Sequence, residues 1–322
     1  MKLEDIRELV SDDLQIVDRR IRERLHSEVA LVDQVSAYII AGGGKRLRPL
    51  LVVLAARAAG YHGVQHIDAA AFIEFIHTAT LLHDDVVDGS SKRRGRDTAN
   101  EVWGNETSVL VGDFLYSRAF QMMAEIGSLP IMRIMADATN TIAEGEVLQL
   151  LNAHDPETTE ERYLNVIYRK TARLFEAGAE IAAVLAEASD AVRGALAEYG
   201  RHVGIAFQLI DDLLDYRGSS EERGKNLGED LAEGKPTLPL IHALRNGNEQ
   251  QRAVIRLAIE QGGLAELAQI TRAIEATGGL DYTAQLARSE ADAALTALTA
   301  VPESPYARAL RALAAFAVER SY

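Results

Sequence analysis

The sequence predicts an all-α fold, because almost every long segment repeats its apolar residues at the helical period. In residues 67–88, steps of three and four residues give one apolar face made of Ala71, Phe75, Thr78, Ala79 and Leu82. No segment shows the alternation of apolar and polar residues expected of a half-buried strand. The pair Asn246-Gly247 follows a helical pattern, so it indicates a helix end and not a hairpin turn.

The same periodicity and its breakers place the remaining elements. Helical patterns cover residues 3–25, 107–125, 131–151, 172–188, 191–217 and 250–320. Glycines 42–44 separate two predicted helices, and Pro49 lies just inside the second, where its missing N–H costs nothing. Predicted loops cover residues 89–98, 155–159, 217–236 and 262–263. The two longest loops each follow directly on a cluster of aspartates.

Length and composition favour one large domain. The chain has 322 residues, of which 48% are hydrophobic, enough for a large buried core. Chains longer than about 250–300 residues often divide into domains. The seven prolines and 24 glycines are few, however, and no Ser/Pro/Gly-rich linker interrupts the chain. We therefore expect a single domain spanning residues 1–322.

Composition also limits the partners and the location. The net charge of −14 argues against nucleic-acid binding, which depends on clustered Lys and Arg. The absence of cysteine excludes disulfides and thiolate metal sites and is compatible with a reducing compartment. Residues 1–8 do not resemble a signal or transit peptide, and the apolar stretch 49–56 is far shorter than the ~20 residues that span a bilayer. We expect a soluble, cytoplasmic protein without a transmembrane segment.

Two clusters of three aspartates have identical spacing: Asp84, Asp85 and Asp88, and then Asp211, Asp212 and Asp215. The first and last members of each cluster share a helical face, where like charges destabilise a helix by about 0.2–0.5 kcal/mol. They also lie near predicted helix C-termini, where the helix dipole disfavours negative charge. Bound Mg²⁺, which takes carboxylate, water and phosphate oxygens, would relieve both effects. A solvated acidic surface could explain one such cluster, but it does not account for two.

Basic groups accompany both clusters. Lys45 and Arg48 are one turn apart at a predicted helix start, a place that attracts phosphate through free N–H groups and the guanidinium. The segment lacks the Walker spacing and no strand precedes it, so we reject a P-loop. The other candidates are Lys92, Arg93 and Arg94 after the first cluster, Lys225 and Lys235 after the second, and Lys170, Thr171 and Gln208 before it. Each alone could be an ordinary surface residue, but together they suggest metal ions alternating with anionic phosphates.

Two histidines lie close to the first cluster. His77 lies two turns before Asp84 on the same helical face, and its spacing alone leaves both a core residue and a ligand open. His83 lies on another face, and we interpret it as structural.

These motifs, in this order, make the chain similar to the trans-isoprenyl diphosphate synthase family from about Gly42 to Pro239. Both family Asp-Asp-x-x-Asp motifs match, as does the Gly-Gly-Lys-Arg-x-Arg-Pro segment at residues 43–49. The arginine pair, the Lys-Thr pair, the glutamine and the Gly-Lys-x-Thr-Leu-Pro segment at residues 234–239 also match. The two-residue gap in Asp-Asp-Val-Val-Asp resembles medium- and long-chain members, octaprenyl diphosphate synthases among them, rather than bacterial farnesyl synthases.

The resemblance implies the activity and the role of each residue. The family condenses isopentenyl diphosphate onto an allylic diphosphate primer, here expected to be farnesyl diphosphate, in homodimers of all-helical subunits around a deep central cavity. By the resemblance, isopentenyl diphosphate would be bound by Lys45, Arg48, His77 and Arg94. The allylic diphosphate would be bound by Arg93, Lys170, Thr171, Gln208, Lys225 and Lys235. Mg²⁺ would bridge it to Asp84, Asp88 and Asp211.

Product length is expected to depend on the helix that ends at Asp84. Thr80 and Ala79 lie about 6–7.5 Å deeper along it, at 1.5 Å per residue. In the family, bulky aromatic residues at this depth stop elongation, whereas these two are small. The expected floor candidates are Ile76, Phe72, Met123 and Met135, each of which could equally be ordinary core. We expect a product near octaprenyl size for quinone side chains, with transient membrane contact possible at its release.

Three other functions are alternatives to this one. A terpene cyclase would share the first aspartate motif, but would replace the second with a mixed Asn/Ser/Glu motif. A His-Asp metal phosphohydrolase would leave the second cluster and the glycine segment unexplained. A non-catalytic helical partner subunit would be expected to have lost aspartates that are present here.

Overall fold

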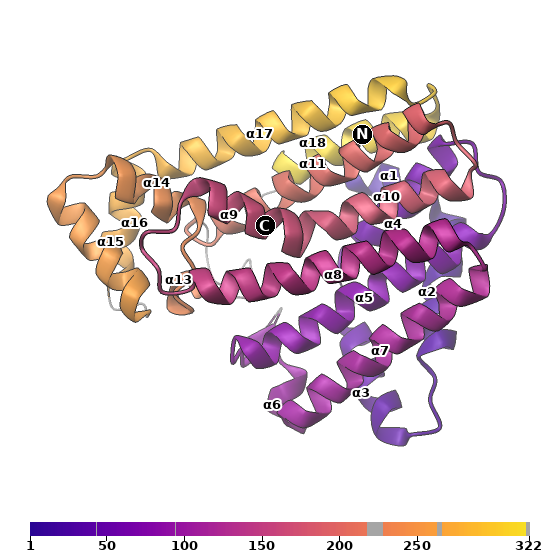
Figure 1. Cartoon of the computed structure of the whole chain (residues 1–322), viewed down its shortest axis with the longest axis horizontal. Helices are drawn as coiled ribbons and strands as arrows, with labels where there is room; N and C mark the ends of the chain where they lie inside the picture. The colour runs from indigo at the N-terminus through magenta and orange to yellow at the C-terminus, as the bar shows by residue number, and fades with distance from the viewer. Residues whose placement is uncertain (43, 94, 218–227, 263–265, 320–322) are drawn as a thin grey trace. The chain divides into compact units, whose positions relative to one another are not determined.

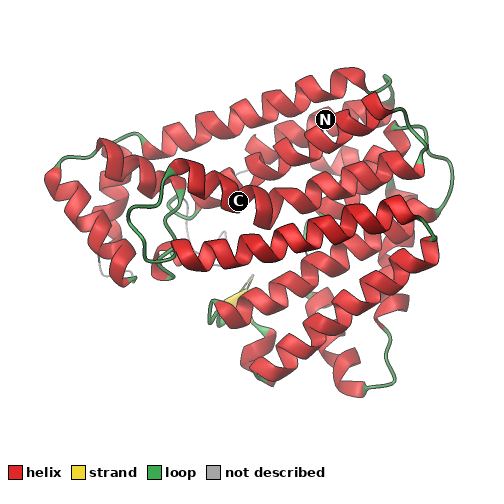
Figure 2. Cartoon of the chain, viewed as in Figure 1, coloured by secondary structure: helices red, strands yellow, loops and turns green. Residues whose placement is uncertain are grey.

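The computed structural model describes residues 1–42, 44–93, 95–217, 228–262 and 266–319. Within these ranges nearly all regular structure is helical, as the sequence predicts (Figure 2). The chain divides into two compact units that alternate along the sequence. The first comprises residues 1–137, 174–200 and 297–313, and the second comprises residues 138–173, 201–296 and 314–322.

The first unit is built around the long helix α5, Gln65–Val87 (Figure 1). Helix α5 packs against α7, α4 and α2. Its predicted apolar face is buried, and so is nearly every other side chain between residues 66 and 76, as expected for a helix inside a large core. The other helices that lie wholly in this unit are α1 (Leu3–Leu9), α2 (Ser11–Leu25), α3 (Ala30–Ala41), α4 (Leu47–Ala58), α6 (Ala99–Trp103) and α7 (Asn105–Ile126).

A two-stranded antiparallel ribbon lies in the predicted loop at residues 89–98. Strand β1, Lys92–Arg93, pairs with β2, Arg96–Asp97, with Lys92 opposite Asp97. Strands of two residues are too short to show an alternating pattern, so the sequence did not reveal them. The ribbon brings Arg93 back toward the end of α5.

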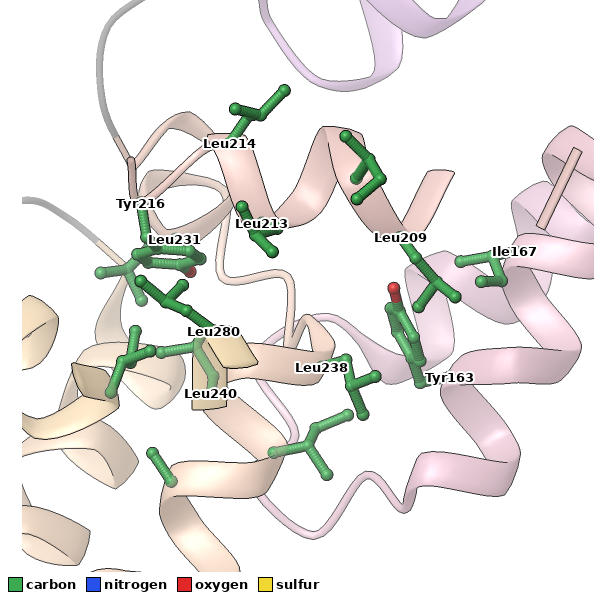
Figure 3. Packing of buried hydrophobic residues seen from close by; sticks show 14 of the residues in the cluster. Tyr163, Ile167, Leu209, Leu213, Leu214, Tyr216, Leu231, Leu238, Leu240 and Leu280 are labelled. Carbon is green, nitrogen blue, oxygen red and sulfur yellow. The ribbon is translucent and has the colours of Figure 1, made fainter. Parts of the chain in front are cut away.

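The second unit has its own core, part of which Figure 3 shows. Leu209 and Leu213 pack there with Leu238 and Leu240. The elements that lie wholly in this unit are α9 (Glu160–Ile167), the π-helical turn η1 (Tyr168–Ala172), α13 (Glu229–Ala232), α14 (Leu238–Asn246), α15 (Glu249–Gln261) and α16 (Leu267–Ala276). Helix α14 ends at Asn246, which confirms that Asn246-Gly247 marks a helix end.

No linker separates the two units, because every boundary between them falls inside a helix. These helices are α8 (Leu129–Asn152), α10 (Arg173–Leu185), α11 (Asp190–Leu214), α17 (Gly279–Ala297) and α18 (Pro305–Glu319), and the 3₁₀ turn η2 (Leu298–Ala300) follows α17. The single domain therefore remains a prediction that this connectivity supports. Among the described residues, no helix is long and apolar enough to cross a membrane.

Candidate active site

The first aspartate cluster ends α5, where its members have different environments. Asp84 and Asp88 are half-buried, and the Asp88 backbone N–H donates to the Asp84 carbonyl at 2.8 Å. Asp85 points elsewhere and is only 4% exposed. The guanidinium of Arg93 donates to its Oδ1 from Nε at 2.8 Å and from Nη2 at 2.7 Å. Asp85 therefore fixes Arg93 on the ribbon, while Asp84 and Asp88 form the accessible pair. Arg94 lies outside the described residues.

The basic segment before α4 differs from the simple helix start that the sequence suggests. Lys45 is exposed and precedes the N-cap residue Arg46, whereas Arg48 lies in the first turn. The Arg48 guanidinium lies 4.4 Å from the centre of the Phe175 ring, a cation–π contact within the same unit. Arg46 has φ 46° and ψ 40°, so a left-handed residue separates the two predicted ligands. Gly43 lies outside the described residues.

The two histidines near the first cluster have different surroundings. His77 is half-buried on α5, one turn after Glu74. The Nε2 atom of His83 lies 3.2 Å from the Val109 carbonyl oxygen and 3.4 Å from Asp113 Oδ1 on α7. Its ring also fills the space over Gly112, where a Cβ would approach Nε2 to 2.3 Å. His83 therefore holds α5 against α7, in agreement with its structural interpretation.

The second cluster, at the end of α11, is more buried than the first. Asp211 is half-buried, but Asp212 and Asp215 are each only 3% exposed. The backbone N–H of Asp230 donates to Asp215 Oδ2 at 3.2 Å, so Asp215 positions the start of α13. Equal spacing therefore does not give two equivalent carboxylate pairs, because the last aspartate of the second cluster is buried and accepts a hydrogen bond from the start of α13.

Asp212 is the centre of a buried hydrogen-bond network. The Tyr163 hydroxyl donates to Oδ2 at 2.5 Å, and Gln208 Nε2 donates to Oδ1 at 2.7 Å. Thr171 in turn donates to Gln208 Oε1 at 3.0 Å. Burial raises the pKa of Asp212 well above its usual value, and the charge of Asp230 adds to this, although the bonds from Tyr163 and Gln208 oppose it. A carboxylate in such surroundings is stabilised by a nearby positive charge.

The predicted Lys170-Thr171 pair lies in the π-helical turn η1, a rare geometry that often occurs at functional sites. Lys170 Nζ donates to Glu146 Oε2 and to Gln149 Oε1 of α8, each at 2.6 Å. Gly145 permits this approach, because a Cβ there would lie 2.8 Å from both Arg169 Cβ and the Lys170 nitrogen. Neither the π-turn nor the role of Gly145 was predicted, since both depend on contacts between distant segments.

Replacing Gly145 by alanine is expected to displace η1 and with it Lys170, which the family resemblance assigns to the allylic diphosphate. Overpacking of this kind costs about 1–3 kcal/mol, which lowers the melting temperature by a few degrees. The KM for the allylic diphosphate should rise several-fold as Lys170 moves. Gly194→Ala on α11 is the matched control, because its Cβ would meet nothing within 4 Å. A Gly145→Ala enzyme with unchanged steady-state kinetics and melting temperature would contradict this account.

A pocket of about 80 Å³ in the second unit brings these groups together. Its walls include five predicted site residues, namely Lys170, Thr171, Gln208, Asp212 and Lys235. Asp230 and Tyr163, which the sequence did not single out, line it as well. The pocket therefore places two lysines and two acidic groups around one small space. Lys225 lies outside the described residues.

The backbone that carries Lys235 is held by His154, another residue that the sequence did not single out. The backbone N–H of His154 donates to the Gly234 carbonyl oxygen at 2.8 Å. A Cβ added at Gly234 would lie only 2.3 Å from the His154 imidazole. Gly234 has φ +70°, so both its conformation and its surroundings favour glycine. Lys235 Nζ is 2.5 Å from Glu233 Oε2. The sequence signal that could have pointed to this support is Gly234, which directly precedes the predicted ligand Lys235.

The proposed chain-length residues lie in the first unit. Ile76, Ala79, Met123 and Met135 are fully buried, as is Phe72. Thr80 is half-buried, and its hydroxyl donates to the His77 carbonyl at 2.8 Å. Their burial fits either a cavity floor or ordinary core, so the chain-length role remains a prediction.

The carboxylates fit a hard divalent cation. Asp84 and Asp88 are half-buried at the end of α5, and Asp211 is half-buried near the end of α11. Within the described part of the chain, no three His, Asp or Glu side chains converge to form a complete metal site. Mg²⁺ usually takes only one or two carboxylates and completes its shell with water and substrate phosphate oxygens. The accessible aspartates therefore suit a cation that shares its ligands with a diphosphate.

Comparison with known proteins gives the same family that the order of the motifs indicates. The polyprenyl synthetase family model matches residues 29–277. Octaprenyl diphosphate synthase of Escherichia coli (strain K12) is 55% identical over 321 residues, 99% of each protein. The geranyl-diphosphate-specific all-trans-nonaprenyl-diphosphate synthase of Rhodobacter capsulatus is 47% identical over 295 residues, 91% of this chain and 90% of that protein.

A solved structure has the same fold. Polyprenyl synthase from Caulobacter crescentus CB15, complexed with calcium and isoprenyl diphosphate, superposes with a TM-score of 0.96 at 45% identity. The match covers 99% of this chain and 98% of that one. The folds are therefore the same over essentially the whole chain. The protein belongs to the polyprenyl synthetase family.

Proposed function

We propose that this protein extends an allylic diphosphate with isopentenyl diphosphate units to make a long all-trans polyprenyl diphosphate. The observation that carries the proposal is the pocket in the second unit, where Lys170, Gln208 and Lys235 surround the Asp212 network. The full-length identity to octaprenyl and nonaprenyl synthases supports a long product. A terpene cyclase is disfavoured because the second Asp-Asp-x-x-Asp motif is intact.

The residues suit an ionisation and condensation mechanism. The bond between the allylic carbon and its diphosphate oxygen breaks, and Lys170 and Lys235 stabilise the negative charge that develops on the leaving group. The double bond of isopentenyl diphosphate, held by Lys45, Arg48 and His77, then forms the new carbon–carbon bond. Loss of one proton restores an allylic double bond, and the departing diphosphate is the base we propose. No Ser or Cys nucleophile is required.

Mg²⁺ is the metal we propose, held by Asp84, Asp88 and Asp211. When bound, it would neutralise charge on the allylic diphosphate. The accessible carboxylates and the hard oxygen ligands that Mg²⁺ prefers support this choice. The calcium in the Caulobacter crescentus complex belongs to that structure and is consistent with a divalent-cation site.

Several finer properties belong to the same proposal. We propose farnesyl diphosphate as the primer and an octaprenyl product for quinone side chains, made by a cytoplasmic enzyme that contacts the membrane only transiently. We also propose that the chain folds as one domain and forms a homodimer. Exposed apolar side chains support the dimer: Val109 and Leu110 on α7 in the first unit, and Val147, Leu150 and Leu151 on one face of α8 in the second.

The two diphosphate sites can be separated by mutation. Lys45→Ala is expected to raise the KM for isopentenyl diphosphate about 10- to 100-fold, because hydrogen bonds to charged groups contribute about 1.5–3 kcal/mol. Lys235→Ala should instead raise the KM for the allylic substrate by a similar factor. Steady-state kinetics with each substrate varied in turn measure both effects, and the exposed Lys2→Ala is the control. Equal effects of the two variants on the same substrate would contradict the assigned roles.

A further inference from the structure

Arg46 has an unusual backbone conformation for its residue type. It caps α4 with φ 46° and ψ 40°, in the left-handed region that non-glycine residues rarely adopt. A glycine would adopt this conformation readily, and residues 42–44 show that the segment accepts glycine. An arginine in this conformation indicates that its side chain stabilises the turn, because such conformations persist where surrounding contacts enforce them.

The side chain of Arg46 makes that contact with Glu74 of α5. Arg46 Nη1 lies 2.5 Å from Glu74 Oε1, and the two side chains are only 16% and 10% exposed. Arg46 Nε is also 4.0 Å from Asp18 Oδ1. Just before the turn, Arg7 Nη1 donates to the Lys45 carbonyl at 3.1 Å. The turn is therefore fixed to α5 by a mostly buried ion pair and to α1 by a second guanidinium.

The residues on either side of this turn are predicted to bind isopentenyl diphosphate. Lys45 precedes Arg46, and Arg48 follows it with its guanidinium over the Phe175 ring. Glu74 lies one helical turn before His77, the third predicted ligand. We propose that the Arg46–Glu74 ion pair is a positioning pair that sets Lys45 and Arg48 relative to His77. This inference rests on the proposed function, because that function supplies the substrate.

A double-mutant cycle tests the positioning role. Glu74→Gln removes the charge with little change of shape, and Arg46→Gly removes the side chain while suiting the left-handed backbone. Displacement of binding groups by about 1 Å can cost up to about 100-fold, so each single variant should raise the KM for isopentenyl diphosphate about 10- to 100-fold. The double variant should be no worse than either single one, because both break the same contact. The KM for the allylic substrate and the kcat at saturation should change less than threefold.

Asp68→Asn is the control, because Asp68 lies on α5 like Glu74 and makes an ion pair with Arg20 of α2, with side chains 21% and 30% exposed. Its loss should lower the melting temperature comparably and leave the KM for isopentenyl diphosphate unchanged. Calorimetric titration with isopentenyl diphosphate gives a readout independent of turnover, and Arg46→Lys, which keeps the charge, should recover part of the affinity. An Arg46→Gly enzyme with wild-type affinity, or equal losses for both substrates, would overturn the positioning role alone. A wild-type protein that fails to bind isopentenyl diphosphate would overturn the proposed function as well.

Discussion

Asp84→Ala and Asp211→Ala are each expected to lower turnover by at least about 100-fold, the effect typical of removing one group that stabilises developing charge. Both carboxylates are half-buried, so their loss should leave the fold intact. EDTA should abolish activity and Mg²⁺ should restore it in the wild-type protein. Incorporation of labelled isopentenyl diphosphate measures both effects.

Asp292→Ala provides the control for these two variants. Asp292 is exposed on α17, away from either aspartate cluster in the sequence, so its removal should leave turnover unchanged. Full activity of the wild-type protein in a metal-free assay would rule out the ionisation mechanism. Wild-type turnover of both Asp84→Ala and Asp211→Ala would rule out the assigned carboxylates.

Ala79→Tyr is expected to shorten the product markedly while a first condensation still proceeds. Ala79 lies about 7.5 Å along α5 from Asp84, at 1.5 Å per residue, and is fully buried. A tyrosine at this depth would block the path that we propose for a growing chain along α5. The products are measured by chromatography after removal of the diphosphate.

Ala79→Ser is the control for this change, since it adds one oxygen and should keep the product long. Overpacking by the tyrosine should cost about 1–3 kcal/mol of stability, so the melting temperature is measured alongside. An unchanged product distribution from a folded Ala79→Tyr enzyme would show that the chain takes another route.

Much of this fold could be predicted because it depends on local patterns. The apolar face that ends with Leu82 is buried as predicted, and the glycine at 247 ends its helix. Where the apolar pattern continues from one helix into the next, the sequence does not show the boundary between them. Residues 3–25 form two helices, because Val10 leaves helical geometry with φ −126° and ψ 26°. Residues 250–320 share one helical pattern apart from the predicted loop at 262–263, and their described part divides into α15, α16, α17, η2 and α18.

For the site, the sequence predicted which residues take part but not the contacts that surround them. Spacing alone identified both aspartate clusters, but it could not show that Asp85 pairs with Arg93 or that Asp215 holds the start of α13. These partners lie in β1 and at the start of α13, which come after the helix ends in the chain. Tyr163 was missed for the same reason, since its contact with Asp212 joins residues 49 positions apart.

The most direct test of the central claim is to size the products of the purified protein. It is incubated with farnesyl diphosphate, labelled isopentenyl diphosphate and Mg²⁺, and the dephosphorylated products are separated by chain length. We expect label in a long all-trans polyprenol near octaprenyl size, within a unit or two. Phosphate release without chain growth, or conversion of the primer to cyclic hydrocarbons without incorporation of label, would contradict it.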